Sequence, residues 1–148
     1  MRFLVDTNVL LAASIRQLPA HAECRAFAGR LLGASTPWCL SWVNVYEFLR
    51  VATHPRVFSR PLNWSDAVAA ISPFLSHPRI ELIVETPDHR SALEKTAAEA
   101  GSVSGNFVHD CHLAALMREH DVRRIVTFDT HFRRFEHLEV VRPSEVSP

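Results

Sequence analysis

This chain has almost no lysine and no net charge. Lys95 is the only lysine, and the 16 basic residues are balanced by 16 acidic ones, so the formal net charge at pH 7 is zero. The chain therefore has no overall positive charge that would indicate a nucleic-acid partner. Arginine supplies nearly all the positive charge and suits bidentate phosphate contacts, although such a bias is more often genomic than functional.

Cysteine and long apolar runs are also scarce. Cys24, Cys39 and Cys111 are odd in number and none of them stands in C-x-x-C spacing. This argues against a disulfide framework or a thiolate zinc site and fits a reducing compartment. No apolar run approaches the length of a membrane span, and the N-terminus has no signal-peptide pattern. We therefore expect a cytoplasmic protein that does not enter a membrane.

What the chain does have is length and apolar content for a proper core. Its 148 residues are 47% hydrophobic, with no internal repeat, low-complexity tract or linker, so we expect a single domain over residues 1–148. Short apolar runs alternate with helix-like segments, which predicts an α/β domain with a mostly parallel central sheet. The expected strands cover 3–5, 38–40, 80–84, 124–127 and 139–141, and the expected helices 9–16, 21–32, 43–52, 63–76, 86–100 and 106–120.

Several residues predict where these helices begin and end. Ser41 and Asn106 are expected N-caps, and Asn63 with Asp66 has the spacing of a capping box. Gly33 and Gly101 are the expected stops of the helices before them, and the residues after Val141 are expected to be loosely structured.

The expected helix over 43–52 is apolar nearly all round, which predicts a buried helix. Its polar residues Asn44, Glu47 and Arg50 are spaced by three and therefore share one stripe. This stripe faces either solvent or a site, and the segment alone does not decide between them.

Two acids directly follow buried strands. Asp6 comes after the run Phe3–Val5, and Asp129 stands just past the run that ends at Thr127. In parallel α/β sheets, ligands bind at the carboxyl ends of the strands. Asp6 could equally serve only to cap the next helix.

Asp110 is the clearest anomaly, because counting along its helix places it on the face of Leu113, Ala114 and Met117. An ionised carboxylate on a core face is costly unless it is paired or bound to metal. The alternatives are a buried salt bridge to an arginine and a metal site. Together with Glu47, the three aspartates make four acids without a nearby lysine. Clustered oxygen ligands without thiolates suit Mg²⁺ or Mn²⁺, which activate water and phosphate esters.

At this point the residues match a known family: the chain resembles the PIN-domain ribonucleases, and among them the VapC-type toxins of toxin–antitoxin modules. The resemblance covers nearly the whole chain and follows the family's order. It rests on L-V-D-T-N-V-L-L at 4–11, V-N-V-Y-E-F-L-R-V at 43–51, G-N-F-V-H-D-C-H-L-A-A at 105–115 and T-F-D at 127–129. It implies a PIN-like three-layer α/β/α fold around a mostly parallel sheet, and a metal-dependent endoribonuclease.

The resemblance also implies roles for residues. The family's acids, at the positions of Asp6, Glu47, Asp110 and Asp129, hold one or two divalent ions and drive RNA cleavage. Asn8 and Thr127 match the polar positions that support these acids.

The chain departs from the family in three places. Cys111 and His112 replace small and apolar residues, and His131 stands where many members carry a further acid that would belong to a second metal position.

A cognate antitoxin is the implied partner. We expect it to place a basic side chain, an arginine, against the acids, since arginine binds carboxylates through a bidentate fork. The family also commonly forms homodimers.

More than one interpretation stays open for each of the remaining polar residues. His109 and His112 are three apart but have no cysteine partner for zinc, and are expected to flank the site. The candidates for phosphate contacts are arginines, which a solvated surface explains equally well: Arg50, Arg56 and Arg133, with Arg60 and Arg134 in the wider set. The rival functions are a non-catalytic RNA-binding or protein-interaction module and a metal-dependent phosphatase. An aspartyl phosphatase would carry a second aspartate where this chain has Asn8.

Overall fold

A five-stranded sheet forms the centre of the computed structural model, which describes residues 1–148. The strand order is β3-β2-β1-β4-β5 and every neighbouring pair is parallel. The expectation of a mostly parallel sheet is therefore confirmed. The strands are β1 (Phe3–Val5), β2 (Trp38–Ser41), β3 (Ile80–Ile83), β4 (Arg124–Val126) and β5 (Glu139–Val141).

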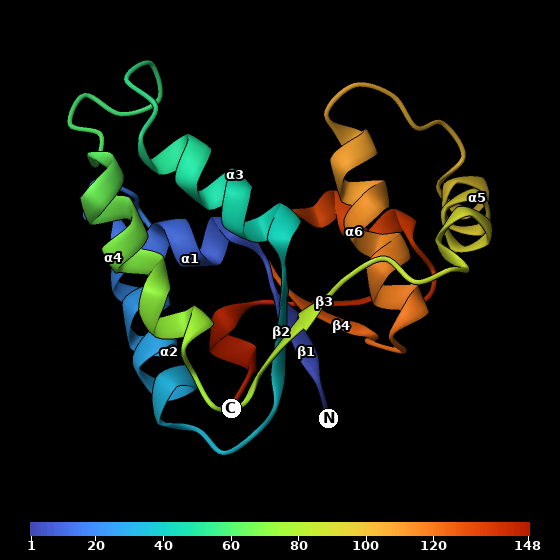
Figure 1. Cartoon of the computed structure of the whole chain (residues 1–148), viewed down its shortest axis with the longest axis horizontal. Helices are drawn as coiled ribbons and strands as arrows, with labels where there is room; N and C mark the ends of the chain where they lie inside the picture. The colour runs from blue at the N-terminus through green and yellow to red at the C-terminus, as the bar shows by residue number, and fades with distance from the viewer.

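Helices cover both faces of this sheet. Figure 1 shows α1 to α4 on one side of the strands and α5 with α6 on the other, which confirms the three-layer α/β/α arrangement. Two short 3-10 helices, η1 and η2, follow β4 and β5. The bounds are α1 (Thr7–Ser14), α2 (His21–Gly33), α3 (Trp42–Ala52), α4 (Trp64–Leu75), α5 (His89–Ala100), α6 (Phe107–Glu119), η1 (Thr130–Arg134) and η2 (Pro143–Glu145).

The strands contribute to two separate cores because successive side chains point to opposite faces. Phe3 and Val5 belong to the larger cluster of 23 buried residues, which also holds the apolar faces of α1 to α4. Leu4, between them, belongs to the second cluster of 12, with Leu113 and Met117 of α6. Burial on both faces explains why β1 is apolar without interruption.

The chain leaves the centre of the sheet in two directions. From β1 it runs through α1 and α2 to β2, whereas β4 lies on the other side of β1 and is reached through α5 and α6. The point between β1 and β4 is thus the topological switch point, where parallel sheets form ligand sites. It brings together the residues that follow β1, β2 and β4.

Most predicted helix ends are present. Ser41 caps α3 through a full capping box with Asn44, and the Asn63 side chain accepts from the Asp66 backbone N–H at 2.8 Å. Gly101 ends α5 with a φ of 78°, which is a conformation that glycine adopts without steric cost.

One predicted helix stop is wrong, and one predicted N-cap stands at the expected position without a capping hydrogen bond. Gly33 is the last residue of α2, and Ala34 caps the helix instead. Asn106 has a helical φ of −62° and makes no side-chain cap hydrogen bond. The turn before α6 is made one residue earlier by Gly105, whose φ is 58°.

Two other expectations need correction. The helix α3 is not buried all round: Trp42 and Tyr46 are 47% and 68% exposed, because only one face of α3 packs on the larger core. The C-terminal residues are not loose, since η2 packs against α2 and Val146 is buried.

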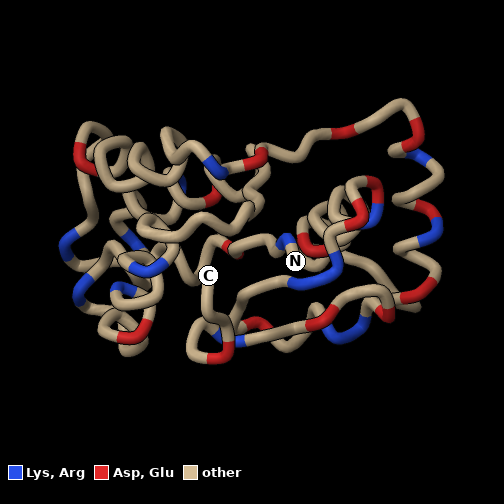
Figure 2. The backbone as a smooth tube through the Cα atoms, turned by 90° about the horizontal axis from the view of Figure 1, so that it is seen from below, with Lys and Arg blue, Asp and Glu red and all other residues tan.

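None of the helices combines the length and apolar character needed to cross a membrane. Basic and acidic positions are interspersed along the backbone rather than separated into two blocks (Figure 2).

Candidate metal centre

An open cleft of about 690 Å³ lies at the switch-point edge of the sheet. Three of the four predicted acids line it, and its only apolar lining residue is Phe107. The lining residues are Glu47, Arg50, Asn106, Phe107, His109, Asp110, Asp129, His131 and Arg134.

Asp6 lies buried beside this cleft, with 7% of its surface exposed. One carboxylate oxygen accepts from the backbone N–H of Thr7 at 2.7 Å, which makes Asp6 the N-cap of α1. The other oxygen accepts from Thr127 Oγ1 at 2.7 Å and from Asn8 Nδ2 at 3.1 Å. The Asp6 side chain therefore caps α1 and also lies at the candidate site, so the two interpretations of this residue do not exclude each other.

Thr127 and Asn8 join the ends of β1 and β4. Besides donating to Asp6, Thr127 Oγ1 accepts from Asn8 Nδ2 and from the backbone N–H of Asp129, both at 2.9 Å. Asn8 Oδ1 in turn accepts from the backbone N–H of Phe128 at 3.3 Å. These bonds fix the Asp6 carboxylate relative to the backbone that carries Asp129.

The helix α3 brings Glu47 to the cleft along its polar stripe. Asn44 is fully buried, Glu47 is half-buried and Arg50 is exposed, so the stripe runs from the core out to the rim. Since Glu47 and Arg50 both line the cleft, the structure favours the stripe as a seam facing a site.

Asn44 and Thr7 hold α3 against α1, a contact that the sequence did not predict. Asn44 Nδ2 donates to Thr7 Oγ1 at 3.3 Å, and the Thr7 hydroxyl donates to the Asn44 carbonyl at 3.3 Å. The signal that could have found Asn44 is the capping-box spacing from Ser41, which fixes the direction of the side chain.

Asp110 lies half-buried in the first turn of α6, one turn before the buried Leu113 and Ala114 and two turns before the buried Met117. The predicted core face is therefore present and Asp110 stands at its open end. It forms no hydrogen bond or ion pair, so the alternative of a buried salt bridge is not observed. Burial, followed by the charges of Asp129 and Glu47, raises the pKa of Asp110 to about 6.

Asp6 shows the same effect more strongly. Burial raises its pKa to about 7, with further contributions from the charges of Glu47 and Asp110, despite the hydrogen bonds from Thr127 and Thr7 that act in the opposite direction. These mutual interactions show that the structure brings Asp6, Glu47, Asp110 and Asp129 together at one place.

Asp129 and His131, which follow β4, also line the cleft. Asp129 caps η1 by accepting from the backbone N–H of His131 at 2.8 Å, and the His131 ring nitrogen Nδ1 lies 3.2 Å from the same carboxylate. Potential ligand atoms of Asp110, Asp129 and His131 all lie within 4.8 Å of one another. The sequence singled out His131 only as a departure from the family; its position two residues after Asp129, at a helix start, was the available signal.

The donor set of the cleft fits a hard divalent cation. Its acids offer carboxylate oxygens, and the neighbouring Cys111 thiol is buried in the core on the other side of α6. No lysine or arginine is ion-paired with any of the four acids. Buried carboxylates without a countercharge favour a bound cation, and oxygen ligands favour Mg²⁺ or Mn²⁺.

The arginines of the expected RNA contacts are separated by the fold. Arg50 lines the cleft, as does Arg134, whose guanidinium stacks over the Phe107 ring at 4.0 Å. Arg56 lies on the loop between α3 and α4, and Arg133 lines a different hollow beside Thr127. Only Arg50 and Arg134 are therefore brought next to the acids.

Comparison with known proteins identifies the family. The PIN domain family matches residues 3–138. Ribonuclease VapC48 of Mycobacterium tuberculosis (strain CDC 1551 / Oshkosh) is 33% identical over 138 residues, which cover 93% of this chain and 94% of that protein.

Two solved structures share the fold at low sequence identity. VapBC2 from Rickettsia felis, bound to a promoter DNA fragment, superposes with a TM-score of 0.66 at 17% identity, over 96% of this chain and 98% of that one. VapC20 of Mycobacterium tuberculosis, described as a Sarcin-Ricin loop cleaving toxin, gives a TM-score of 0.62 at 18% identity, over 88% and 92%. The chain belongs to the PIN-domain family and, within it, to the VapC group.

Proposed function

We propose that this protein is a metal-dependent endoribonuclease and the toxin of a toxin–antitoxin pair. The observation that carries the proposal is the meeting of four carboxylates, none of them paired with a lysine or an arginine, at the switch point of a parallel sheet. The name ribonuclease of the similar VapC48 and the description of VapC20 as a Sarcin-Ricin loop cleaving toxin support it.

Asp6, Glu47, Asp110 and Asp129 are the residues that would hold Mg²⁺ or Mn²⁺. Such an ion, when bound, polarises the phosphate and lowers the pKa of water so that it supplies a hydroxide nucleophile at neutral pH. Asp6 is held in one orientation by Thr127 and Asn8, which serve as its supporting residues. Because the pKa values of Asp6 and Asp110 are raised to about 7 and about 6, metal binding by these ligands should weaken as the pH falls below those values.

The cleft also offers a place for the RNA backbone. Arg50 and Arg134 lie on the same cleft as the acids, where their guanidinium groups would bind the phosphates that flank the cleaved one. Arg134 is held by its stacking on Phe107 and by donation to the Ala100 and Ser102 carbonyls. Arg56 and Arg133 remain predicted contacts for RNA that extends beyond the cleft.

We further propose that an antitoxin inhibits the protein by placing an arginine against the acids, and that the protein forms a homodimer. A guanidinium would neutralise the uncompensated carboxylates through bidentate hydrogen bonds. The open cleft leaves room for such a side chain. A structure of the complex with the antitoxin bound only away from the cleft would contradict the mechanism, and sedimentation of the free protein as a monomer would contradict the dimer.

The proposed activity is tested with purified, antitoxin-free protein and total cellular RNA. We expect cuts at defined positions with Mg²⁺ or Mn²⁺, none with chelator, and none from Asp110→Asn. Glu94→Gln is the matched control, because Glu94 is an exposed acid on α5 paired only with Arg90. Equal cleavage by Asp110→Asn would refute the site. RNA binding without cleavage by the wild type would favour a non-catalytic RNA-binding module instead.

A further inference from the structure

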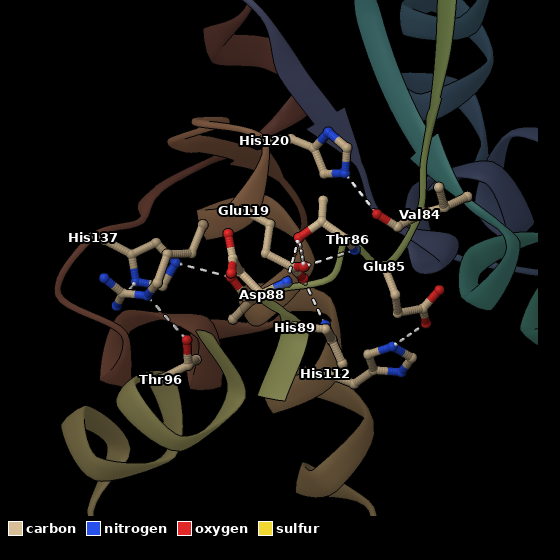
Figure 3. A network of polar contacts seen from close by, with 12 residues as sticks. Val84, Glu85, Thr86, Asp88, His89, Thr96, His112, Glu119, His120 and His137 are labelled. Carbon is tan, nitrogen blue, oxygen red and sulfur yellow. Dashed lines mark hydrogen bonds and ion pairs between the residues drawn. The ribbon is translucent and has the colours of Figure 1, made fainter. Parts of the chain in front are cut away.

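A second group of possible metal ligands lies outside the acidic cleft, on the side of the sheet covered by α5 and α6 (Figure 3). It consists of Glu85, His89 and His112, which we call the histidine cluster. Glu85 follows β3, His89 is the first residue of α5 and His112 lies on α6. One potential ligand atom from each lies within 4.8 Å of those of the other two.

The contacts within the histidine cluster show that its donor atoms already face one another. Nε2 of His112 lies 2.8 Å from Oε1 of Glu85. The rings of His89 and His112 meet edge to face with their centroids 5.2 Å apart. A hydrogen bond between an imidazole and a carboxylate holds a proton that a metal ion can replace.

Glu119 orients His89 from behind. Its side chain is only 2% exposed, and its Oε2 lies 2.6 Å from Nδ1 of His89. Its other oxygen accepts from the backbone N–H and the hydroxyl of Thr86, at 2.9 and 2.6 Å. A carboxylate on one ring nitrogen is the usual support of a metal-binding histidine, because it fixes the tautomer and leaves the other nitrogen as the ligand.

We propose that Glu85, His89 and His112 bind one Zn²⁺ ion, with Glu119 as a positioning residue. Two histidines and one glutamate form a recognised zinc ligand set with a fourth position left open. The Glu85 side chain is 51% exposed, so solvent reaches the cluster at this ligand. Imidazole ligands distinguish this site from the acidic cleft, whose carboxylates favour Mg²⁺ or Mn²⁺.

The site would add a metal link between three segments that Glu119 already joins through hydrogen bonds to Thr86 and His89. Zn²⁺ would tie the residues after β3 and the start of α5 to α6, the helix that also carries Asp110 two residues before His112. His112 lines a shallow hollow with Glu47, Arg50 and His109 next to the acidic cleft. The proposal rests on the histidine cluster alone and holds whether or not the protein cleaves RNA.

The experiment is calorimetric titration of Zn²⁺ into the metal-free full-length protein, repeated with Co²⁺ under visible absorption. We expect one strong Zn²⁺ site per chain and a four-coordinate Co²⁺ spectrum that Zn²⁺ removes. Glu85→Gln, on an exposed side chain that leaves folding intact, should weaken Zn²⁺ binding by about 100-fold or more, and Glu119→Gln by about 10- to 100-fold with an altered Co²⁺ spectrum. His112→Asn should abolish the spectrum.

Two control variants separate this site from its neighbours. His109→Asn removes a histidine three residues before His112 that is not part of the cluster, and Asp129→Asn removes a ligand of the acidic cleft. Both should keep the strong Zn²⁺ site. The proposal is overturned if the wild type binds no Zn²⁺, if Glu85→Gln and His112→Asn bind it as the wild type does, or if Asp129→Asn alone removes it. In the first case the cluster is a metal-free hydrogen-bonded link between α5 and α6.

Discussion

The acidic cleft and the polar network around Glu119 and Glu99, between α5 and α6, contain carboxyl groups whose pKa values are shifted in opposite directions. In the cleft, the pKa values of Asp6 and Asp110 are raised to about 7 and about 6. In the network, burial also acts to raise the pKa values of Glu119 and Glu99, yet both end below their ordinary value. Burial therefore acts in the same direction on all four carboxyl groups, but their net pKa shifts have opposite signs.

The difference lies in the partners. Glu119 receives hydrogen bonds from His89 and Thr86, and Glu99 from His137 and Arg118, so each charge is compensated within the protein. The charges of the neighbouring carboxylates Asp129 and Glu47 raise the pKa of Asp110 further. Asp6 accepts hydrogen bonds from neutral groups only. A buried acid that the protein compensates serves the fold, whereas an uncompensated one is set up for a cation from outside.

The largest expected effect is on catalysis. Asp6→Asn keeps the size of the side chain and its acceptor oxygen for Thr127, but removes the charge that a metal ligand needs. We expect the rate of RNA cleavage to fall by more than about 100-fold, since even the loss of a supporting group costs 10- to 100-fold. Single-turnover cleavage at saturating Mn²⁺ measures this, and a rate within a few-fold of wild type would show that Asp6 acts only as the α1 cap.

A smaller effect, on stability, is expected in the network. Glu119→Ala leaves His89 and the Thr86 donors without their buried acceptor, which should cost about 1–3 kcal/mol. The melting temperature should fall by about 2–4 °C for each kcal/mol. Glu94→Ala, which removes the exposed ion pair with Arg90, is the control and should change the free energy of unfolding by less than about 0.5 kcal/mol. An unchanged melting temperature for Glu119→Ala would show that the network contributes nothing to the fold.

Asp110→Asn should act in the opposite direction on the metal-free protein. The neutral amide removes repulsion from Asp129 and Glu47, so the variant should melt a few degrees higher at pH 8, on the scale of about 2–4 °C per kcal/mol. Below about pH 4 the difference should vanish, because the wild-type carboxyl is then protonated. Thermal melts in chelator test this, and a lower melting temperature of the variant at pH 8 would contradict the comparison.

The pH dependence of the metal-free wild type follows from the same shifts. A native pKa of Asp6 near 7, against an ordinary value of 3.8, means that the folded state holds more protons than the unfolded state between these values. The contribution of Asp6 to stability is therefore full below about pH 4 and is lost as the pH rises towards 7. Glu119, with a lowered pKa, contributes oppositely: its share is present above pH 4.5 and is lost on acidification. Asp6→Asn should flatten the loss towards pH 7, and denaturant melts across the pH range measure it.

The smallest expected effect concerns RNA binding. Arg50→Ala, tested in an Asp110→Asn background that prevents cleavage, should lower RNA affinity and reduce the salt slope by about 0.7 for one lost phosphate contact. Arg90→Ala, a control on the exposed side of α5 that lies outside the cleft, should leave the slope unchanged. Equal slopes for wild type and Arg50→Ala would place the RNA backbone elsewhere.

Local pattern was sufficient for much of this protein. The five strands and six helices follow from apolar periodicity and from caps such as Ser41 and Asn63, because these features depend on residues only a few positions apart. The positions of Asp6 and Asp129 at the carboxyl ends of strands follow from the same patterns. Parallel alternation of strands and helices then places those ends at one edge of the sheet.

The tertiary structure alone decided what each polar residue faces. Trp42 and Tyr46 look as apolar as Val45, yet they are exposed because α3 packs through one side only. The Thr127 hydrogen bond to Asp6 joins residues 121 positions apart, and the histidine cluster joins three segments whose residues have no shared spacing. Such contacts depend on the packing of whole layers rather than on local periodicity, so an acid's partner, and with it the sign of its pKa shift, is fixed only when the chain has folded.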